Sequence, residues 1–215
     1  MSNETTNPVV KWILIGVIVV SVCVVGAFVL LGTYPAGEYR VAKELEKRGF
    51  VVEYERQSNN IWKYPVIVIG ENLSITEDDS RLLCQLSHIQ ILNFLRCDLS
   101  GWNLDEIRNC RELRYIYSNT ATHFPIDEIG TLAACPMTWI GINNDCLNDA
   151  NLTEFAKFTN LEYLDLEKNA GITDAGIEHL EKIASLRLVR LKGTSVTKEG
   201  IEEFQKKRPD VRVVF

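Results

Sequence analysis

The chain has 215 residues, enough for one domain with an appended segment. Its formal net charge is −6, and it has no basic stripe that could neutralise phosphates, which argues against a nucleic-acid-binding protein. Charged residues make up 24% of the chain and apolar residues 46%, which are ordinary globular values and argue against a disordered chain.

After a short tail at 1–11, an uncharged apolar run fills residues 12–32. As a helix it would span about 30 Å, the thickness of the bilayer hydrocarbon. The run therefore predicts one transmembrane helix, a signal anchor contacting the lipid bilayer, and a single-pass membrane localisation. A cleaved signal peptide fits less well, because its apolar core is normally about 7–15 residues long and ends at a small-residue cleavage site. A buried soluble helix would normally keep a polar face.

The flanking charges do not decide which side of the membrane the following domain occupies. Arg40, Lys43 and Lys47 follow the run and favour a cytoplasmic C-terminal domain. Nearby glutamates offset these charges, and the lone Lys11 before the run also suits an uncleaved export signal.

The next segment, 33–64, predicts a short helix followed by a strand. Within GEYRVAKELEKR at 37–48, apolar residues fall on one helical face, and Gly49 stands where a C-terminal cap belongs. FVVEYER at 50–56 has the composition of a strand. We expect this αβ segment to cap the domain that follows.

A strand pattern then recurs along the chain, with apolar residues at its first, fourth and sixth positions. Five steps of 24 or 25 residues separate the first positions, which are Ile89, Leu113, Met137, Leu161, Leu186 and Val211. The unit that begins at Leu113 departs from the pattern at its sixth position, where Ser118 replaces an apolar residue.

Helical segments are predicted between these strands. Each starts at a residue whose side chain can accept a bond from a free backbone N–H: Thr76, Ser100, Asn148, Thr173 and Thr197. Acidic residues fall in four of the first turns, where the helix dipole favours negative charge: Glu77, Asp149, Asp174 and Glu199. The segment 122–135 departs from the pattern, because Pro125 and Gly130 favour a shorter or irregular helix.

A strand, a turn and a helix every 24 or 25 residues bury a continuous core only when such units stack. The stretch LEYLDLEKNAGITDAGIEHLEKI at 161–183 resembles a leucine-rich repeat, and ITDAGI and VTKEGI resemble the variant with Thr-Asp before the helix. The resemblance covers 65–215. It implies an α/β solenoid of six or seven units, preceded here by the transmembrane helix, with a parallel sheet on the concave face and short helices on the convex face. It also implies that the concave face binds macromolecular partners.

The sequence predicts neither an enzyme nor a cofactor or metal site. It has no phosphate loop, dinucleotide fingerprint or HExxH motif. The three histidines, His88, His123 and His179, fall at unrelated phases of the repeat. Cys110 and Cys135 occupy equivalent positions in neighbouring units, but helices packed about 8–10 Å apart are too distant for a disulfide. Bridging would require the irregular unit to close up, so this question stays open.

Alternate side chains of a strand face opposite sides, so the third, fifth and seventh positions should face away from the core. At the third position we expect Tyr115, Trp139 and Tyr163 to form a touching aromatic column. Exposed aromatic clusters mark interfaces more often than scattered apolar residues do. The predicted binding surface for a protein or peptide comprises Tyr115, Tyr117, Trp139, Tyr163, Asp165, Glu167, Arg190 and Lys192. Alternatively, the aromatic residues only stack on each other, or the 33–64 segment covers them.

The sequence ends in VRVVF at 211–215, which predicts a final strand with an unpaired edge and weak self-association through it. Two functions follow from the sequence. The first is a membrane-anchored interaction module, without catalytic activity, that binds through its concave face. The alternative is a structural protein that assembles through this strand and the membrane helix and has no dedicated ligand.

Overall fold

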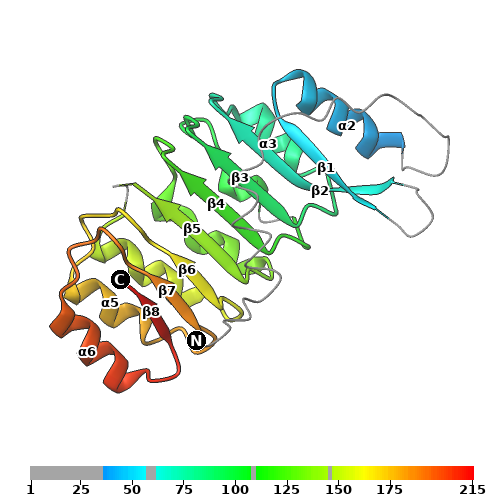
Figure 1. The fold of residues 1–215 in the computed structure, drawn as a ribbon. Helices are drawn as coiled ribbons and strands as arrows, with labels where there is room; N and C mark the ends of the chain where they lie inside the picture. The colour runs from blue at the N-terminus through cyan, green and yellow to red at the C-terminus, as the bar shows by residue number, and fades with distance from the viewer. Residues whose placement is uncertain (1–35, 57–61, 108–109, 145–146) are drawn as a thin grey trace, which may run out of the picture. The chain divides into compact units, whose positions relative to one another are not determined.

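A computed structural model of the chain describes residues 36–56, 62–107, 110–144 and 147–215 (Figure 1). The first elements are the helix α2 and a hairpin of two strands, α2 (Ala36–Lys47), β1 (Val51–Arg56) and β2 (Trp62–Glu71). The units that follow alternate helix and strand: α3 (Glu77–Leu83), β3 (Ile91–Leu95), α4 (Leu104–Ile107), β4 (Tyr115–Asn119), η1 (Ile126–Ala134), β5 (Trp139–Asn143), η2 (Asp149–Lys157), β6 (Tyr163–Asp165), α5 (Asp174–Leu180), β7 (Leu188–Arg190), α6 (Lys198–Lys207) and β8 (Arg212–Val214).

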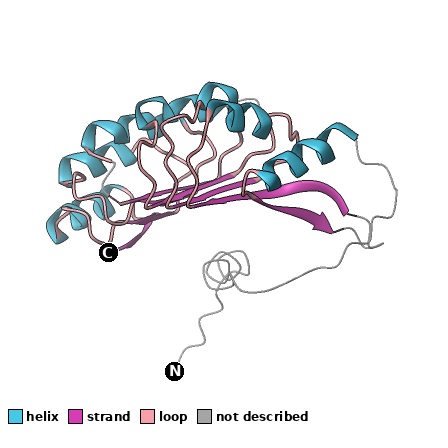
Figure 2. Ribbon diagram, turned by 90° about the horizontal axis from the view of Figure 1, so that it is seen from above, coloured by secondary structure: helices cyan, strands magenta, loops and turns pink. Residues whose placement is uncertain are grey.

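The described strands form one sheet in which each strand pairs with the next along the chain. β1 and β2 are antiparallel, and every later pair is parallel. The helices lie along one face of this sheet (Figure 2). This arrangement confirms the predicted α/β repeat fold with a parallel sheet.

The core lies between the sheet and its helices. The fourth and sixth positions of the repeat point into it, as Leu92 and Phe94 of β3 and Ile140 and Ile142 of β5 show by being fully buried. Fully burying such a side chain stabilises the fold by about 1.5–3 kcal/mol. One cluster of buried side chains runs from Val41 near the start of the described chain to Val211 near its end. The predicted apolar period is therefore the period of the core.

Neighbouring units are joined at the starts of their helices by an aspartate, a threonine and a glycine. Thr173 and Thr197 cap α5 and α6, as predicted. In addition, the Asp174 carboxylate accepts bonds of 2.7 Å from both the backbone N–H and the hydroxyl of Thr197 in the following unit. Gly200 leaves the space for that carboxylate, because a methyl group there would collide with Asp174 Oδ1.

The same contact occurs one unit earlier. Asp149 accepts bonds of 2.7 Å from the backbone N–H and the hydroxyl of Thr173, and a side chain at Gly176 would collide with its carboxylate. At both junctions the aspartate that follows the cap of one helix therefore bonds the cap threonine of the next helix, and the glycine three residues after that threonine leaves space for the carboxylate.

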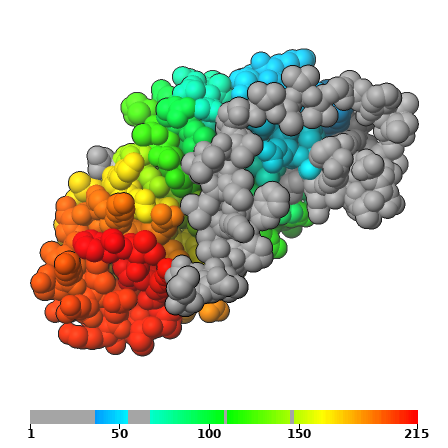
Figure 3. Space-filling view, in the orientation of Figure 1, coloured from blue at the N-terminus to red at the C-terminus, as the bar shows by residue number. Residues whose placement is uncertain are grey.

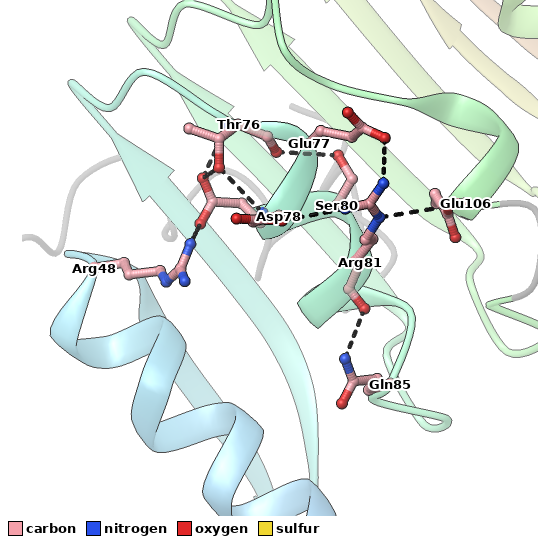
Figure 4. Close-up of polar contacts among 9 residues, drawn as sticks. Arg48, Thr76, Glu77, Asp78, Ser80, Arg81, Gln85 and Glu106 are labelled. Atoms are coloured by element: carbon pink, nitrogen blue, oxygen red, sulfur yellow. Dashed lines mark hydrogen bonds and ion pairs between the residues drawn. The ribbon is translucent and has the colours of Figure 1, made fainter.

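The start of the solenoid is covered by α2 and β1, at the place where the sequence predicts a helix and a strand. Val41, Ala42 and Leu45 of α2 are buried. Arg48, just after α2, donates a 2.9 Å bond to Asp79 of α3, which also completes the capping box with Thr76 (Figure 4). β2 runs across the predicted boundary between residues 64 and 65, so the capping segment and the first unit share a strand.

Two of the described helices, η1 and η2, are 3-10 helices. Pro125 precedes η1 and makes no side-chain cap, which agrees with the irregular helix predicted over 122–135. The segment η2 is also a 3-10 helix, although Asn148 caps it through bonds from the N–H groups of Ala150 and Asn151.

The final strand is one residue out of the predicted register. Leu188 pairs with Arg212, so Arg212 takes the third position, where the spacing predicts Val213, and Val214 takes the fifth position, where it predicts Phe215. Val211 is nevertheless buried, as its apolar side chain requires.

The membrane prediction is corrected by the structure. Within the ranges described above, no helix is long and apolar enough to cross a membrane. The predicted span, 12–32, lies outside the described residues, as does the tail at 1–11. The single-pass membrane localisation is therefore wrong on this finding, and the function considered below does not include it.

Candidate functional site

The face of the sheet opposite the helices carries the residues that the sequence assigns to a binding surface. This face is toward the viewer in Figures 1 and 3. Tyr115, Trp139 and Tyr163 occupy directly paired positions on β4, β5 and β6. All three side chains are half-buried. The third position of the repeat therefore places three aromatic residues side by side on neighbouring strands.

The ring contact within this group differs from the predicted column. Trp139 packs on Tyr117, with ring centroids 5.2 Å apart and planes inclined by 33°. Tyr117 stands at the fifth position of β4, so the contact runs diagonally across two strands rather than along the third position. Cross-strand aromatic pairs of this kind contribute roughly 0.5–1.5 kcal/mol beyond the area that they bury.

Gly141 makes the diagonal contact possible. It pairs with Tyr117 across β4 and β5, and it lies two residues after Trp139 in the same strand. A Cβ atom at this glycine would lie 2.5 Å from Cδ2 of Tyr117 and 3.1 Å from Cη2 of Trp139. The Tyr117 ring therefore occupies the space that a side chain at position 141 would take.

Two asparagines hold the Tyr117 hydroxyl. Nδ2 of Asn119 and Nδ2 of Asn143 each donate to it over 3.2 Å. Burial, followed by the negative charge of Asp165, raises the pKa of Tyr117. The phenol is thus held neutral and fixed in orientation, which keeps its ring against Trp139.

A charged group adjoins the aromatic pair on the side of β6 and β7. Asp165 pairs with Gly141 and is only 4% exposed, and burial raises the pKa of its carboxyl group. The backbone N–H of Glu167 donates to Asp165 over 3.2 Å. Arg190 on β7 lies 2.8 Å from the Glu167 carboxylate through both Nε and Nη2, but its Nε is 3.8 Å from Asp165. Lys192 is exposed beyond the end of β7.

Three residues of this face were not singled out from the sequence. Gly141 and Asn93 stand at the fifth position of the repeat, and Asn143 stands at the seventh. Each is at an outward position of the repeat pattern, so reading the fifth and seventh positions together would have pointed to them. The contacts of Gly141 and Asn143, however, depend on the orientation of the Tyr117 ring.

The histidines and cysteines do not gather at this face. His88 lies 3.0 Å from Glu112, and His123 lies 2.9 Å from Asp98, in different units. Among the described cysteines, Cys84, Cys97 and Cys110 are free thiols, so Cys110 is not bridged to Cys135. Within the described ranges, no group of three or more histidine, cysteine, aspartate or glutamate side chains could hold a metal ion.

No protein-family model and no curated protein matches the chain. Similar solved structures include an internalin of Listeria monocytogenes, with 15% identity over 68% of this chain and 39% of that one, at a TM-score of 0.47. A leucine-rich repeat protein of Leptospira interrogans shows 17% identity over 62% of this chain and 39% of its own, at a TM-score of 0.43. Internalin C2 of Listeria monocytogenes shows 13% identity over 70% of each chain, at a TM-score of 0.46. The chain thus spans about two fifths of the length of the first two proteins.

Proposed function

We propose that the protein is a non-catalytic interaction module that binds a protein or peptide through the face of its sheet opposite the helices, the outer face of the sheet. The observation that carries this proposal is the aromatic pair of Tyr117 and Trp139, which stands beside the charged group of Asp165, Glu167 and Arg190 on one face. The described helices all lie on the opposite face, so they leave this surface uncovered (Figure 2).

The composition of the surface supports a macromolecular ligand. Aromatic residues and arginine are the types that most often dominate the energy of protein interfaces, particularly when they are packed and partly shielded from water. Tyr115, Trp139 and Tyr163 are half-buried, so they are partly shielded from water, and the side chain of Arg190 is 40% exposed. The sheet also holds these residues rigidly, which lowers the entropy that binding would cost.

A crosslinking pull-down from cells that make the protein tests this proposal. The bait is the full chain, compared with a variant in which Tyr115, Trp139 and Tyr163 are all replaced by serine. Tyr39→Ser serves as the matched control, because Tyr39 is an exposed aromatic residue on α2, away from the candidate surface. Circular dichroism first establishes that the triple variant keeps its fold.

The proposal predicts a partner that the wild type and Tyr39→Ser both recover and the triple variant loses. Recovery of the same proteins by all three baits would mean that the aromatic residues only pack on one another.

Self-association through the terminal strand is the second candidate function, favoured by a separate observation. β8 is one of the two edge strands of the described sheet, and Phe215 beside it is 54% exposed. An unpaired strand edge can pair with another chain. Sedimentation velocity over a concentration series should then show dimers of the wild type that Phe215→Ser weakens. A chain that stays monomeric at the highest concentration would refute this candidate.

A further inference from the structure

The outer face of the sheet contains buried polar atoms that lack a hydrogen-bond partner. Asn143 is 6% exposed, and its Oδ1 has no partner in the described part of the chain. Its Nδ2 donates to the Tyr117 hydroxyl, so the carbonyl oxygen is the atom of this amide that lacks a partner. A buried acceptor without a donor destabilises the free protein, and a ligand donor would remove that cost.

The Asp165 carboxylate adjoins the Asn143 side chain, which hydrogen-bonds to it, and it is incompletely matched by positive charge. It is 4% exposed and accepts a backbone bond from Glu167, but the nearest cationic atom, Nε of Arg190, is 3.8 Å away. The same guanidinium makes its 2.8 Å contacts with Glu167, so it is committed elsewhere. Burying a carboxylate is costly unless a charged donor binds it directly.

An aromatic wall completes this part of the surface. Tyr117, Gly141 and Asp165 are directly paired on three neighbouring strands, and strands lie about 4.8 Å apart. The Asp165 carboxylate acts electrostatically on the Tyr117 phenol, whose ring packs on Trp139, so both rings and the carboxylate belong to one part of this face. Ring faces attract cations, and the attraction is stronger where water is excluded.

These groups together define the chemistry of the ligand. The unpartnered oxygen of Asn143 favours a ligand with N–H donors, and the Asp165 carboxylate favours a positive charge. The rings of Tyr117 and Trp139 favour a planar group that can stack on them. A guanidinium meets all three requirements, because its flat fork donates to oxygens in its plane and stacks on rings with its face. An ammonium group would satisfy the charge but not the planar stacking.

We propose that this site binds an arginine side chain of the partner protein, with the guanidinium against Trp139 and its N–H groups donating to Asp165 and to Oδ1 of Asn143. The inference rests on the proposed function and specifies what the surface recognises. The formal charge of −6 on the whole chain also favours a basic partner.

Short peptides test this proposal with the full chain. The probe is acetyl-Gly-Gly-Arg-Gly-Gly-amide, and the principal control carries citrulline, which keeps the shape of arginine but has no charge. A third peptide carries lysine. Binding is followed by the indole N–H signal of Trp139 in the tryptophan-labelled protein, which Trp139→Phe identifies among the four tryptophans.

The proposal predicts that the arginine peptide shifts the Trp139 signal saturably and that the citrulline peptide binds at least about tenfold more weakly. The lysine peptide should also bind more weakly than the arginine peptide. Asp165→Asn should lower affinity for the arginine peptide by about tenfold or more, whereas Glu203→Gln, which removes an exposed carboxylate on α6, should leave it unchanged. Asn143→Ser serves as a second variant and should also weaken binding.

Equal binding of the citrulline or lysine peptide would overturn the proposal, as would full affinity in both Asp165→Asn and Asn143→Ser. No response to the arginine peptide would also overturn it. If the pull-down still loses its partner in the triple serine variant, only this inference fails and the proposed function stands. If the pull-down is unaffected by that variant, the proposed function itself fails.

Discussion

Replacing Gly200 with alanine should destabilise the protein, which is the reverse of the usual effect in a helix. Alanine in place of glycine within a helix normally stabilises by about 0.5–1 kcal/mol. At position 200, however, the new methyl group would occupy the place of the Asp174 carboxylate. That carboxylate accepts two 2.7 Å bonds from Thr197, which it would have to give up or distort.

The size of the effect follows from those two bonds. Bonds to a charged acceptor are worth about 1.5–3 kcal/mol each when buried. Thr197 is exposed, so water replaces part of the loss, and about 1 kcal/mol for each bond is a suitable figure. The loss of about 2 kcal/mol exceeds the propensity gain, so Gly200→Ala should lower the free energy of unfolding by about 1–1.5 kcal/mol.

Urea unfolding followed by circular dichroism measures this change, and a double-mutant cycle identifies its cause. In an Asp174→Ala background the carboxylate is absent and only a 3.0 Å contact with the Cβ atom of residue 174 remains, so Gly200→Ala should cost much less than in the wild type. Gly37→Ala is the matched control, because Gly37 lies in the first turn of α2 and a side chain there would meet nothing within 4 Å. If Gly200→Ala behaves like Gly37→Ala in the wild-type background, the proposed link between units is wrong.

Three further predictions concern the sheet and the core. Gly141→Ala should destabilise the protein by about 1–3 kcal/mol in thermal unfolding, because the new methyl group would displace the Tyr117 ring. An unchanged melting temperature would contradict the described packing. Asn169→Ala should lower the free energy of unfolding in urea by about 3 kcal/mol. The fully buried Asn169 side chain donates to the carbonyls of Ile142 and Leu166 and accepts from the N–H of Leu147. A loss below about 1 kcal/mol would argue against these bonds. Asp165 has a raised pKa in the folded state, so its contribution to stability is fully present below about pH 3.8 and is lost as pH rises through the folded pKa. Unfolding free energies of Asp165→Asn and wild type should therefore diverge in favour of the variant as pH rises from 3 to 7, and a constant difference would refute this assignment.

The strands and their spacing could be predicted because burial acts on every unit in the same way. The apolar residues at the first, fourth and sixth positions face the helices in every unit before the last strand, as Leu161, Leu164 and Leu166 show. Helix starts were predicted at Thr173 and Thr197 because a side-chain cap is a local property of the sequence.

The register of the last strand could not be predicted from the apolar pattern. Val211, Val213 and Val214 offer an apolar residue in either of two registers, so the pattern alone does not separate them. The structure fixes the choice through contacts outside the strand. Arg208 donates to the carbonyls of Ile183 and Leu186 in the preceding unit, which sets where the chain turns into β8.

The links between units and the aromatic contact also depend on three-dimensional stacking. The sequence assigns Asp174 to the dipole of its own helix, but its carboxylate also bonds the following unit. The third position correctly aligns Tyr115, Trp139 and Tyr163, yet the ring partner of Trp139 is Tyr117, because Gly141 leaves space on the diagonal. The spacing of residues along the chain contains no information about the orientation of the Trp139 and Tyr117 rings.

Site-specific photocrosslinking tests the central claim, that the outer face of the sheet binds a partner, most directly. A photoreactive phenylalanine analogue replaces Tyr163 on that face in one form of the chain and Gln205, exposed on α6, in another. The account predicts a defined adduct from position 163 that is absent from position 205 and disappears when Trp139 is also changed to serine. Identical adducts from both positions, or an adduct from position 205 alone, would contradict the claim.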